Sequence, residues 1–302
     1  MLWNRATALD ALRSGDLLEL GISANQLRHN RHPEGVVTYA LRGIACSQNG
    51  IIDDLPREED GSVSLASIPD AEHTSLDALK SLLVARHEQL PGVTFQNLPV
   101  SARHRFSQDP LALAEALPGP HKSGVDSVHI ELEAAQPSFL LEDLHSLVHA
   151  AAACRIFVSA SITIGNGEPL EARVKALEAI RALQQESHAI QAVLICVYHS
   201  MIADARREEE ATAVDYLKTL AVARLFLENI AHVQADWSVM GPKVLELALR
   251  FGADDAGTIP RSQPGSKEPS HHGGESELRR IIRDAGFRPV ERDALFRQSL
   301  LH

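Results

Sequence analysis

One short segment, Val128 to Glu133, carries side chains that could move protons along a single face of a strand. Alternate side chains of a strand point to opposite faces, so His129, Glu131 and Glu133 share one face and apolar residues share the other. An imidazole with two carboxylates could hold a proton-transfer pair or a cation. The spacing is not a specific metal signature, so a metal site is not predicted.

The next predicted strand, 158–164, alternates in the same way and places Ser159, Ser161 and Thr163 on one face. On a further strand near 190–199, Gln191 and His199 share a face with valine and isoleucine residues. We expect the apolar faces to pack under helices and the polar faces to line a solvated ligand cavity inside the fold. The alternative is that the strand holding His129 lies at an edge, with its polar face in water.

Other candidate residues have plainer interpretations. His145 and His149 are expected to be ordinary surface or helix residues. Trp237 could cap a pocket, although a tryptophan within a fold more often belongs to the core. The chain has no G-x-S-x-G nucleophile motif, no P-loop and no G-x-G-x-x-G dinucleotide motif.

The elements that must position these residues alternate between strands and helices. This order is typical of βαβ units and a parallel sheet, and it predicts a single TIM-type (β/α) barrel with extra helices at both ends. We expect an N-terminal helical extension over 1–34, the barrel over 35–258, and a mobile loop with a helical tail over 259–302. The apolar periodicity predicts helices over 6–20, 22–30, 75–89, 109–117, 138–152, 169–186, 208–230, 241–251 and 276–285, and strands over 36–41, 63–68, 93–97, 125–132, 155–164 and 190–198.

Composition excludes several classes of protein. The chain has 302 residues and a formal net charge of −11, which argues against nucleic acid as a partner. No apolar run approaches the ~20 residues that span a bilayer, and the N-terminal segment does not have the pattern of a secretory signal. The 3 cysteines are widely spaced, which indicates a reducing cytoplasm rather than a disulfide framework.

Most of the chain resembles one family. The segments 11–42, 158–187, 209–258 and 275–296 are similar to the radical S-adenosylmethionine (SAM) enzymes of the menaquinone (futalosine) pathway, the futalosine-pathway cyclase and aminofutalosine synthase, which are related to the deazaflavin-forming synthase. The resemblance implies a radical-SAM-like barrel. It also implies that Trp237, Asp254 and Asp255 lie where the last strands meet the active-site mouth, so that both aspartates could contact a ligand. The plainer interpretation is that the aspartates cap a turn.

The chain departs from the family where the cofactors bind. The family holds an iron–sulfur cluster with C-x3-C-x2-C after its first strand, whereas the corresponding stretch here contains Cys46 alone. A glycine pair that approaches SAM in the family is replaced by the stretch 64–68, which has no glycine. The turn Gly165-Asn166-Gly167-Glu168 has asparagine where the family often has histidine. We therefore expect neither cofactor to bind.

Several functions remain open. The first is a degenerate homologue, a pseudoenzyme without the iron–sulfur cluster, that binds a small molecule in a polar lumen or assists an active homologue; it could also form a homo-oligomer. The second is a non-radical acid–base or metal-assisted enzyme that uses His129, Glu131 and His199. The third is a partner-binding protein with a filled lumen. Family membership by itself would imply a menaquinone-pathway cyclase or synthase.

Overall fold

The sheet and its covering helices are largely defined in the computed structural model. It describes residues 3–42, 63–64, 73–89, 95–96, 98–100, 109, 112–113, 125, 127–135, 141–198, 211–235, 240–260, 274–293 and 295–298. The predicted helix over 109–117 and the predicted loop over 259–273 lie largely outside these residues.

An eight-stranded sheet forms the centre of the fold. Its strands follow the order β10-β1-β9-β8-β7-β6-β5-β4, and all paired strands are parallel. A separate parallel pair is formed by β2 and β3. The strand bounds are β1 Val36–Arg42, β2 Val63–Ser64, β3 Phe95–Gln96, β4 Leu98–Val100, β5 Ser127–Glu133, β6 Phe157–Ile164, β7 Ile190–Val197, β8 His232–Ala235, β9 Asp255–Pro260 and β10 Arg288–Glu291.

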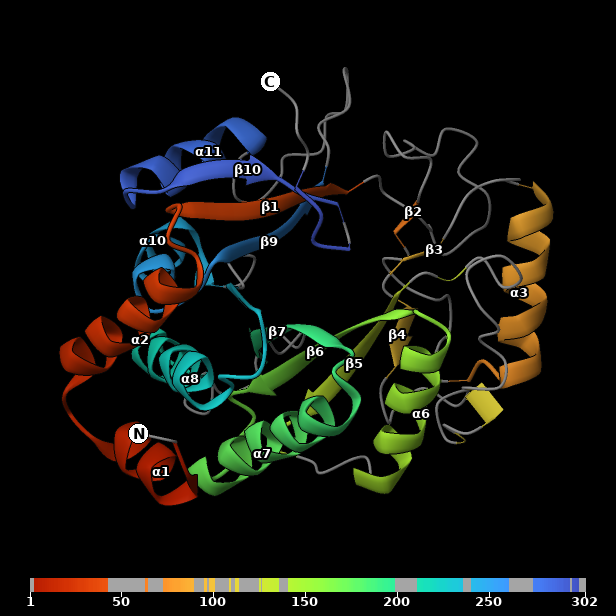
Figure 1. Cartoon of the computed structure of the whole chain (residues 1–302), viewed down its shortest axis with the longest axis horizontal. Coiled ribbons are helices and arrows are strands. Elements are labelled where there is room, and N and C mark those ends of the chain that lie inside the picture. The colour runs from red at the N-terminus through yellow and green to blue at the C-terminus, as the bar shows by residue number, and fades with distance from the viewer. Residues whose placement is uncertain are drawn as a thin grey trace, which may run out of the picture.

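Helices cover the outer surface of this sheet (Figure 1). Because β1 pairs with β9, the first strand returns to the last strands of the barrel, as a TIM-type fold requires. The parallel strands and intervening helices confirm the predicted α/β barrel. The helix bounds are α1 Arg5–Arg13, α2 Leu17–Arg31, α3 Leu76–Gln89, α6 Leu141–Ala153, α7 Leu170–Ser187, α8 Ala213–Phe226, α10 Pro242–Arg250 and α11 Glu275–Asp284.

The N-terminal segment forms two helices, as predicted, but the break between them lies at 14–16 rather than at residue 21. The first helix is therefore shorter than predicted and the second is longer. Asn4 caps α1 by accepting a hydrogen bond from the Thr7 amide, and Asp16 caps α2 in the same way from Glu19. The break at 14–16 turns the chain so that α1 packs on α7 and α8 while α2 packs on α8.

Two strands near the C-terminus were not predicted. β9 is the next element after α10, and β10 adds a strand to the edge of the sheet beside β1. Pro289 in β10 lacks an N–H donor, but an edge strand needs only one paired side. The domain boundaries at 34 and 258 stay a prediction, although β10 joins a segment of the expected tail to the sheet. Within the described helices, none is long and apolar enough to cross a membrane.

Candidate functional site

Strands β5 and β6 bring most of the predicted polar residues into register. His129 pairs with Ser159, Glu131 with Ser161, and Glu133 with Thr163. We call these six residues the polar inner face. In β5 its members are partly buried, while the apolar residues between them are buried. The predicted alternation is confirmed in both strands, apart from the burial of Ser161 on the polar side.

The opposite face of the same strands explains this orientation. Val158, Ile162 and Ile164 of β6 are 1% exposed or less and belong to the hydrophobic core. The same core includes Leu147 of α6 and Leu177 of α7. Burying one apolar side chain of this size contributes about 2 kcal/mol, so the apolar alternation turns the hydroxyls and His129 away from the helices.

His129 lies between two hydroxyl groups of the neighbouring strand. Its Nδ1 is 2.8 Å from Ser159 Oγ, and its Nε2 is 3.0 Å from Ser161 Oγ. A neutral imidazole donates from one nitrogen and accepts at the other, and a serine hydroxyl can take either role. The two serines therefore fix the orientation of the ring and can support either tautomer. A bound molecule would hydrogen-bond to the ring by replacing one of these two hydroxyls.

The residues of β7 that lie beside the polar inner face are not the ones that the sequence pattern predicted. A register shift beside Ser159 places Ala192, Leu194 and Cys196 next to the polar inner face. The sequence pattern predicted that Gln191 and His199 share a face with Val193, Ile195 and Val197. These three apolar residues are buried on the side of the sheet that faces the helices. His199 itself and Trp237 lie outside the described residues, so their predicted roles stay predictions.

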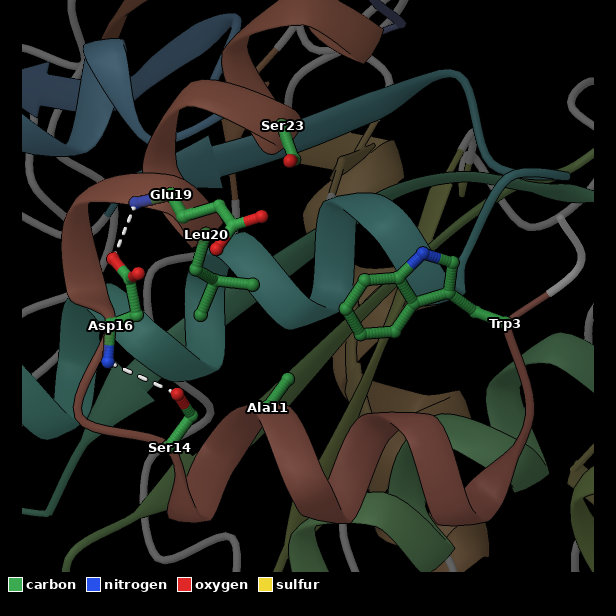
Figure 2. A pocket seen from close by; sticks show the side chains of 7 residues that line it. All are labelled: Trp3, Ala11, Ser14, Asp16, Glu19, Leu20 and Ser23. Atoms are coloured by element: carbon green, nitrogen blue, oxygen red, sulfur yellow. Dashed lines mark hydrogen bonds between the residues drawn. The ribbon is translucent and has the colours of Figure 1, made fainter.

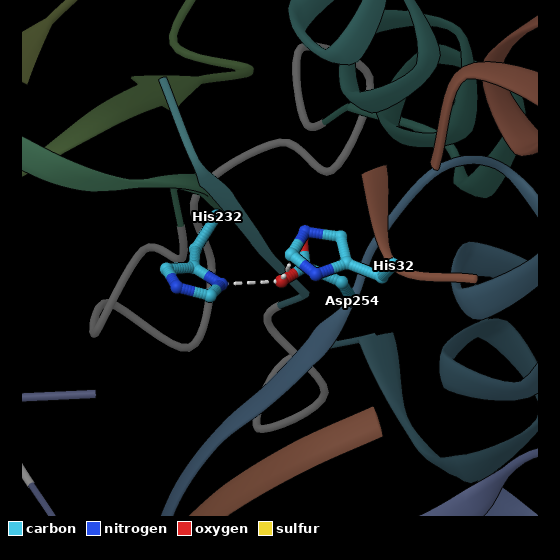
Figure 3. Close-up of side chains that lie close together, drawn as sticks. All are labelled: His32, His232 and Asp254. Carbon is cyan, nitrogen blue, oxygen red and sulfur yellow. Dashed lines mark hydrogen bonds and ion pairs between the residues drawn. The ribbon is translucent and has the colours of Figure 1, made fainter. Parts of the chain in front are cut away.

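Asp254 lies just before β9 and is 2% exposed. Its Oδ1 accepts hydrogen bonds from Arg224 and, at 2.9 Å, from the Val233 amide. Its Oδ2 accepts one from His232 Nδ1 at 2.6 Å and lies 3.4 Å from His32 Nε2 (Figure 3). Burial would raise the pKa of Asp254, but the charge of Arg224 and the hydrogen bond from His232 hold the pKa below its usual range.

Asp255, the first residue of β9, is fully buried and points to the neighbouring strand and the tail. Its two carboxylate oxygens pair with Arg292, with Arg292 Nη2 2.8 Å from Oδ1. Thr38 Oγ1 donates to Oδ2 at 2.6 Å, and the Gly257 amide donates to Oδ1 at 2.8 Å. The carboxylate is therefore held by three separate segments of the chain.

Both aspartates lie at the amino-terminal ends of parallel strands. In barrel enzymes the active site is built at the carboxyl-terminal ends, whereas the other end contributes stability. Their contacts with Arg224 and Arg292 therefore explain their burial as structural ion pairs, and a ligand contact at either one stays a prediction. The sequence interpretation missed His32 and His232, because neither lies in a recognisable motif and only the fold brings them to Asp254.

The turn from β6 to α7 is held by a buried carboxylate. Glu168 accepts hydrogen bonds from the amides of Gly165 at 2.9 Å and Asn166 at 2.8 Å, and from Arg173 Nε at 2.7 Å. The side chain of Glu168 is 0% exposed. Gly165 has a φ of +89° in this turn. The turn 165–168, which resembles a turn of the family, therefore stabilises the backbone at the carboxyl-terminal end of β6.

Gly165→Ala is expected to destabilise the protein by about 2 kcal/mol, because an L side chain rarely adopts positive φ. A Cβ at this position would also lie 2.6 Å from the backbone nitrogen of Ala211. Urea denaturation measures the loss. Gly15→Ala is the matched control, since a Cβ there meets nothing within 4 Å. Equal stability of the two variants would contradict this description of the turn.

Two hollows lie on the outside of the barrel, away from the polar inner face. The first lies between α1 and α2 and has a volume of about 190 Å³, which is small for a ligand site (Figure 2). Within it, Ser14 and Asp16 already accept backbone hydrogen bonds. The second, of about 610 Å³, includes Arg181 and Asn229, whose side chains bind backbone carbonyls. Neither hollow displays a set of converging reactive groups.

The cysteines do not fit the iron–sulfur cluster that the family resemblance implies. Cys154 follows α6 and precedes β6, whereas Cys196 is the penultimate residue of β7. Because β6 and β7 are parallel, these residues lie toward opposite ends of the sheet, roughly 20 Å apart at ~3.3 Å per strand residue. No position of Cys46 would allow the three thiolates to bind one iron–sulfur cluster.

Comparison with known proteins supports the family resemblance. A family profile described as "CofH/MqnC C-terminal region" matches residues 199–300. The cyclic dehypoxanthine futalosine synthase of Streptomyces coelicolor is 25% identical, over 98% of this chain and 85% of its own length. The aminodeoxyfutalosine synthase of Thermus thermophilus is 28% identical, over 72% of this chain and 63% of its own length.

The fold agrees with these matches. A crystal structure of methylornithine synthase superimposes with a TM-score of 0.63 at 13% identity, covering 96% of this chain and 94% of the other. The fold is that of a radical SAM barrel. Together, the profile over the last third of the chain, the curated relatives and the shared fold support the resemblance to the radical SAM enzymes of the menaquinone and deazaflavin pathways.

Proposed function

We propose that this protein is a member of the family that has lost the iron–sulfur cluster and binds a nucleoside of the futalosine type through its sugar hydroxyls on the polar inner face. It performs no radical chemistry. The observation that carries the proposal is His129 held between Ser159 and Ser161 on a face that also bears two carboxylates. The names of the relatives, which include futalosine-type compounds, supply the ligand class.

The chemistry of the polar inner face favours sugar hydroxyls over phosphates. Carboxylates such as Glu131 and Glu133 accept hydrogen bonds and repel anions. The hydroxyls of Ser159 and Thr163 can donate or accept, and both residues are partly exposed. Sugar hydroxyls complement these groups, whereas a phosphate placed on them would bring like charges together.

A second candidate function is acid–base chemistry without a radical. The Nδ1 of His129 is within hydrogen-bond reach of Ser159 Oγ, which is the geometry of a base beside an activated hydroxyl. The second serine, Ser161, would hold the ring in place. In this case His129 would act on a proton of the bound molecule, and the three cysteines would have no role. Either role suits a protein of a reducing cytoplasm.

Isothermal titration with futalosine tests the binding proposal. We expect wild type to bind and His129→Ala to bind about tenfold more weakly, since one net hydrogen bond contributes roughly 1.5 kcal/mol or less. His29→Ala is the matched control, because His29 is exposed on α2. Turnover of futalosine by wild type, lost in His129→Ala, would select the acid–base function. Equal binding by wild type and His129→Ala would contradict both.

A further inference from the structure

A second group of side chains lies on the outer surface of the barrel, between α6 and α7. His145 and His149 are four residues apart on α6, so they project from the same face of the helix. Glu186 lies in the last turn of α7, the neighbouring helix. One ligand atom of each residue lies within 4.8 Å of the other two.

The contacts within this group leave coordination capacity unused. His145 Nε2 lies 2.6 Å from Glu186 Oε2, and the two imidazole rings lie 4.1 Å apart between centroids. The Nε2 atom of His149 is buried and has no hydrogen-bond partner within the described residues. A buried imidazole nitrogen without a partner is costly, and binding a cation through the ring would offset that cost.

The charge around the group also favours a cation. Its one carboxylate makes no ion pair with an arginine or lysine among the residues that the structure describes. The His32, His232 and Asp254 group is the opposite case. There Arg224 already neutralises the carboxylate, and His32 Nε2 lies 3.1 Å from the Ala231 carbonyl, so this nitrogen carries a proton rather than a free lone pair. A metal ion would have to displace both contacts.

We propose that His145, His149 and Glu186 form a site for a divalent transition-metal ion such as Zn²⁺. Two imidazoles and a carboxylate are the ligand types that Zn²⁺ binds, with solvent free to complete the tetrahedron. The ion would join α6 to α7. Both helices contact β6, which carries three residues of the polar inner face, so the metal would brace the helices behind the candidate site.

Equilibrium dialysis of the full chain against Zn²⁺ tests the site. We expect wild type to bind one equivalent of Zn²⁺. His145→Ala and His149→Ala should each lower the affinity for this ion by about tenfold or more, and Glu186→Gln should lower it less. His29→Ala is the control and should bind as wild type does. Because metal binding to the folded state stabilises it, Zn²⁺ should also raise the melting temperature of wild type more than that of His145→Ala.

A mapping experiment separates this site from the other histidines. Zn²⁺ should protect His145 and His149, but not His29, from modification by diethyl pyrocarbonate, as read by peptide mass spectrometry. Protection confined to other histidines would overturn the proposal. Equal Zn²⁺ affinity for wild type and the double variant His145→Ala, His149→Ala would overturn it as well.

Discussion

Asp254→Asn destabilises the protein by about 3–5 kcal/mol, because it leaves a buried guanidinium without a counter-charge. Arg224 is 0% exposed and donates to Asp254, and its other nitrogens already bind the carbonyls of Gly252 and Ala231. The asparagine amide cannot neutralise Arg224, and its NH₂ group would face donors. Urea denaturation at neutral pH measures the loss.

The pH dependence of this loss follows from the lowered pKa of Asp254. A carboxyl whose folded-state pKa is depressed stabilises the protein above its unfolded-state pKa of about 3.9, and this stability is lost as the pH falls toward the folded-state value. The difference between wild type and Asp254→Asn should therefore be full at neutral pH and shrink below about pH 4. A constant difference down to pH 2 would contradict this account.

The control for this variant is Asp284→Asn. Asp284 forms an exposed pair with Arg280 on α11, with 50% and 58% of the two side chains exposed. Exposed pairs contribute about 0–1 kcal/mol, so this variant should unfold almost as wild type does. A loss in Asp254→Asn as small as that in Asp284→Asn would show that the ion pair with Arg224 does not support the fold.

Arg292→Met is the second substitution with a large expected effect, again about 3 kcal/mol or more. It leaves Asp255, which is fully buried, with the hydroxyl of Thr38 and the amide of Gly257 but no positive charge. It also removes the guanidinium that lies 3.9 Å from the ring centroid of Phe296. The methionine keeps most of the apolar length of the side chain, so the lost charge dominates.

The effect of Arg292→Met should be local as well as global. Arg292 directly follows β10 and ties it to β9, so amide exchange in 288–293 should rise more than in β6. Arg280→Met is the control, since Arg280 is exposed on α11. Unchanged exchange in 288–293 together with control-like stability would mean that the Arg292–Asp255 pair does not anchor the tail.

The sequence predicted the fold and part of the candidate site for a physical reason. Strict alternation in β5 and β6 separates apolar from polar side chains, and burial of the apolar set fixes which way His129 and Ser159 point. The hydrogen bonds between them could not be predicted, because strand register depends on the whole sheet.

The missed features depend on contacts between distant segments. β9 begins with Asp255 and contains Gly257 at a φ of +79°, so its sequence reads as a turn. The register shift between β6 and β7 places Ala192, Leu194 and Cys196 beside the polar residues of β6, which the sequence pattern did not predict. The rings of His32 and His232 stack, although the two residues are 200 positions apart in the chain (232 − 32). No local sequence pattern predicts a contact over that separation.

We propose that the protein lacks the iron–sulfur cluster of the enzymes that it resembles. Anaerobic reconstitution of the full chain with iron and sulfide, followed by iron analysis and visible absorption, tests it most directly. We expect no stoichiometric iron and no iron–sulfur absorption, because Cys154 and Cys196 cannot join Cys46 around one iron–sulfur cluster. A stoichiometric [4Fe–4S] cluster that persists after desalting would contradict the claim.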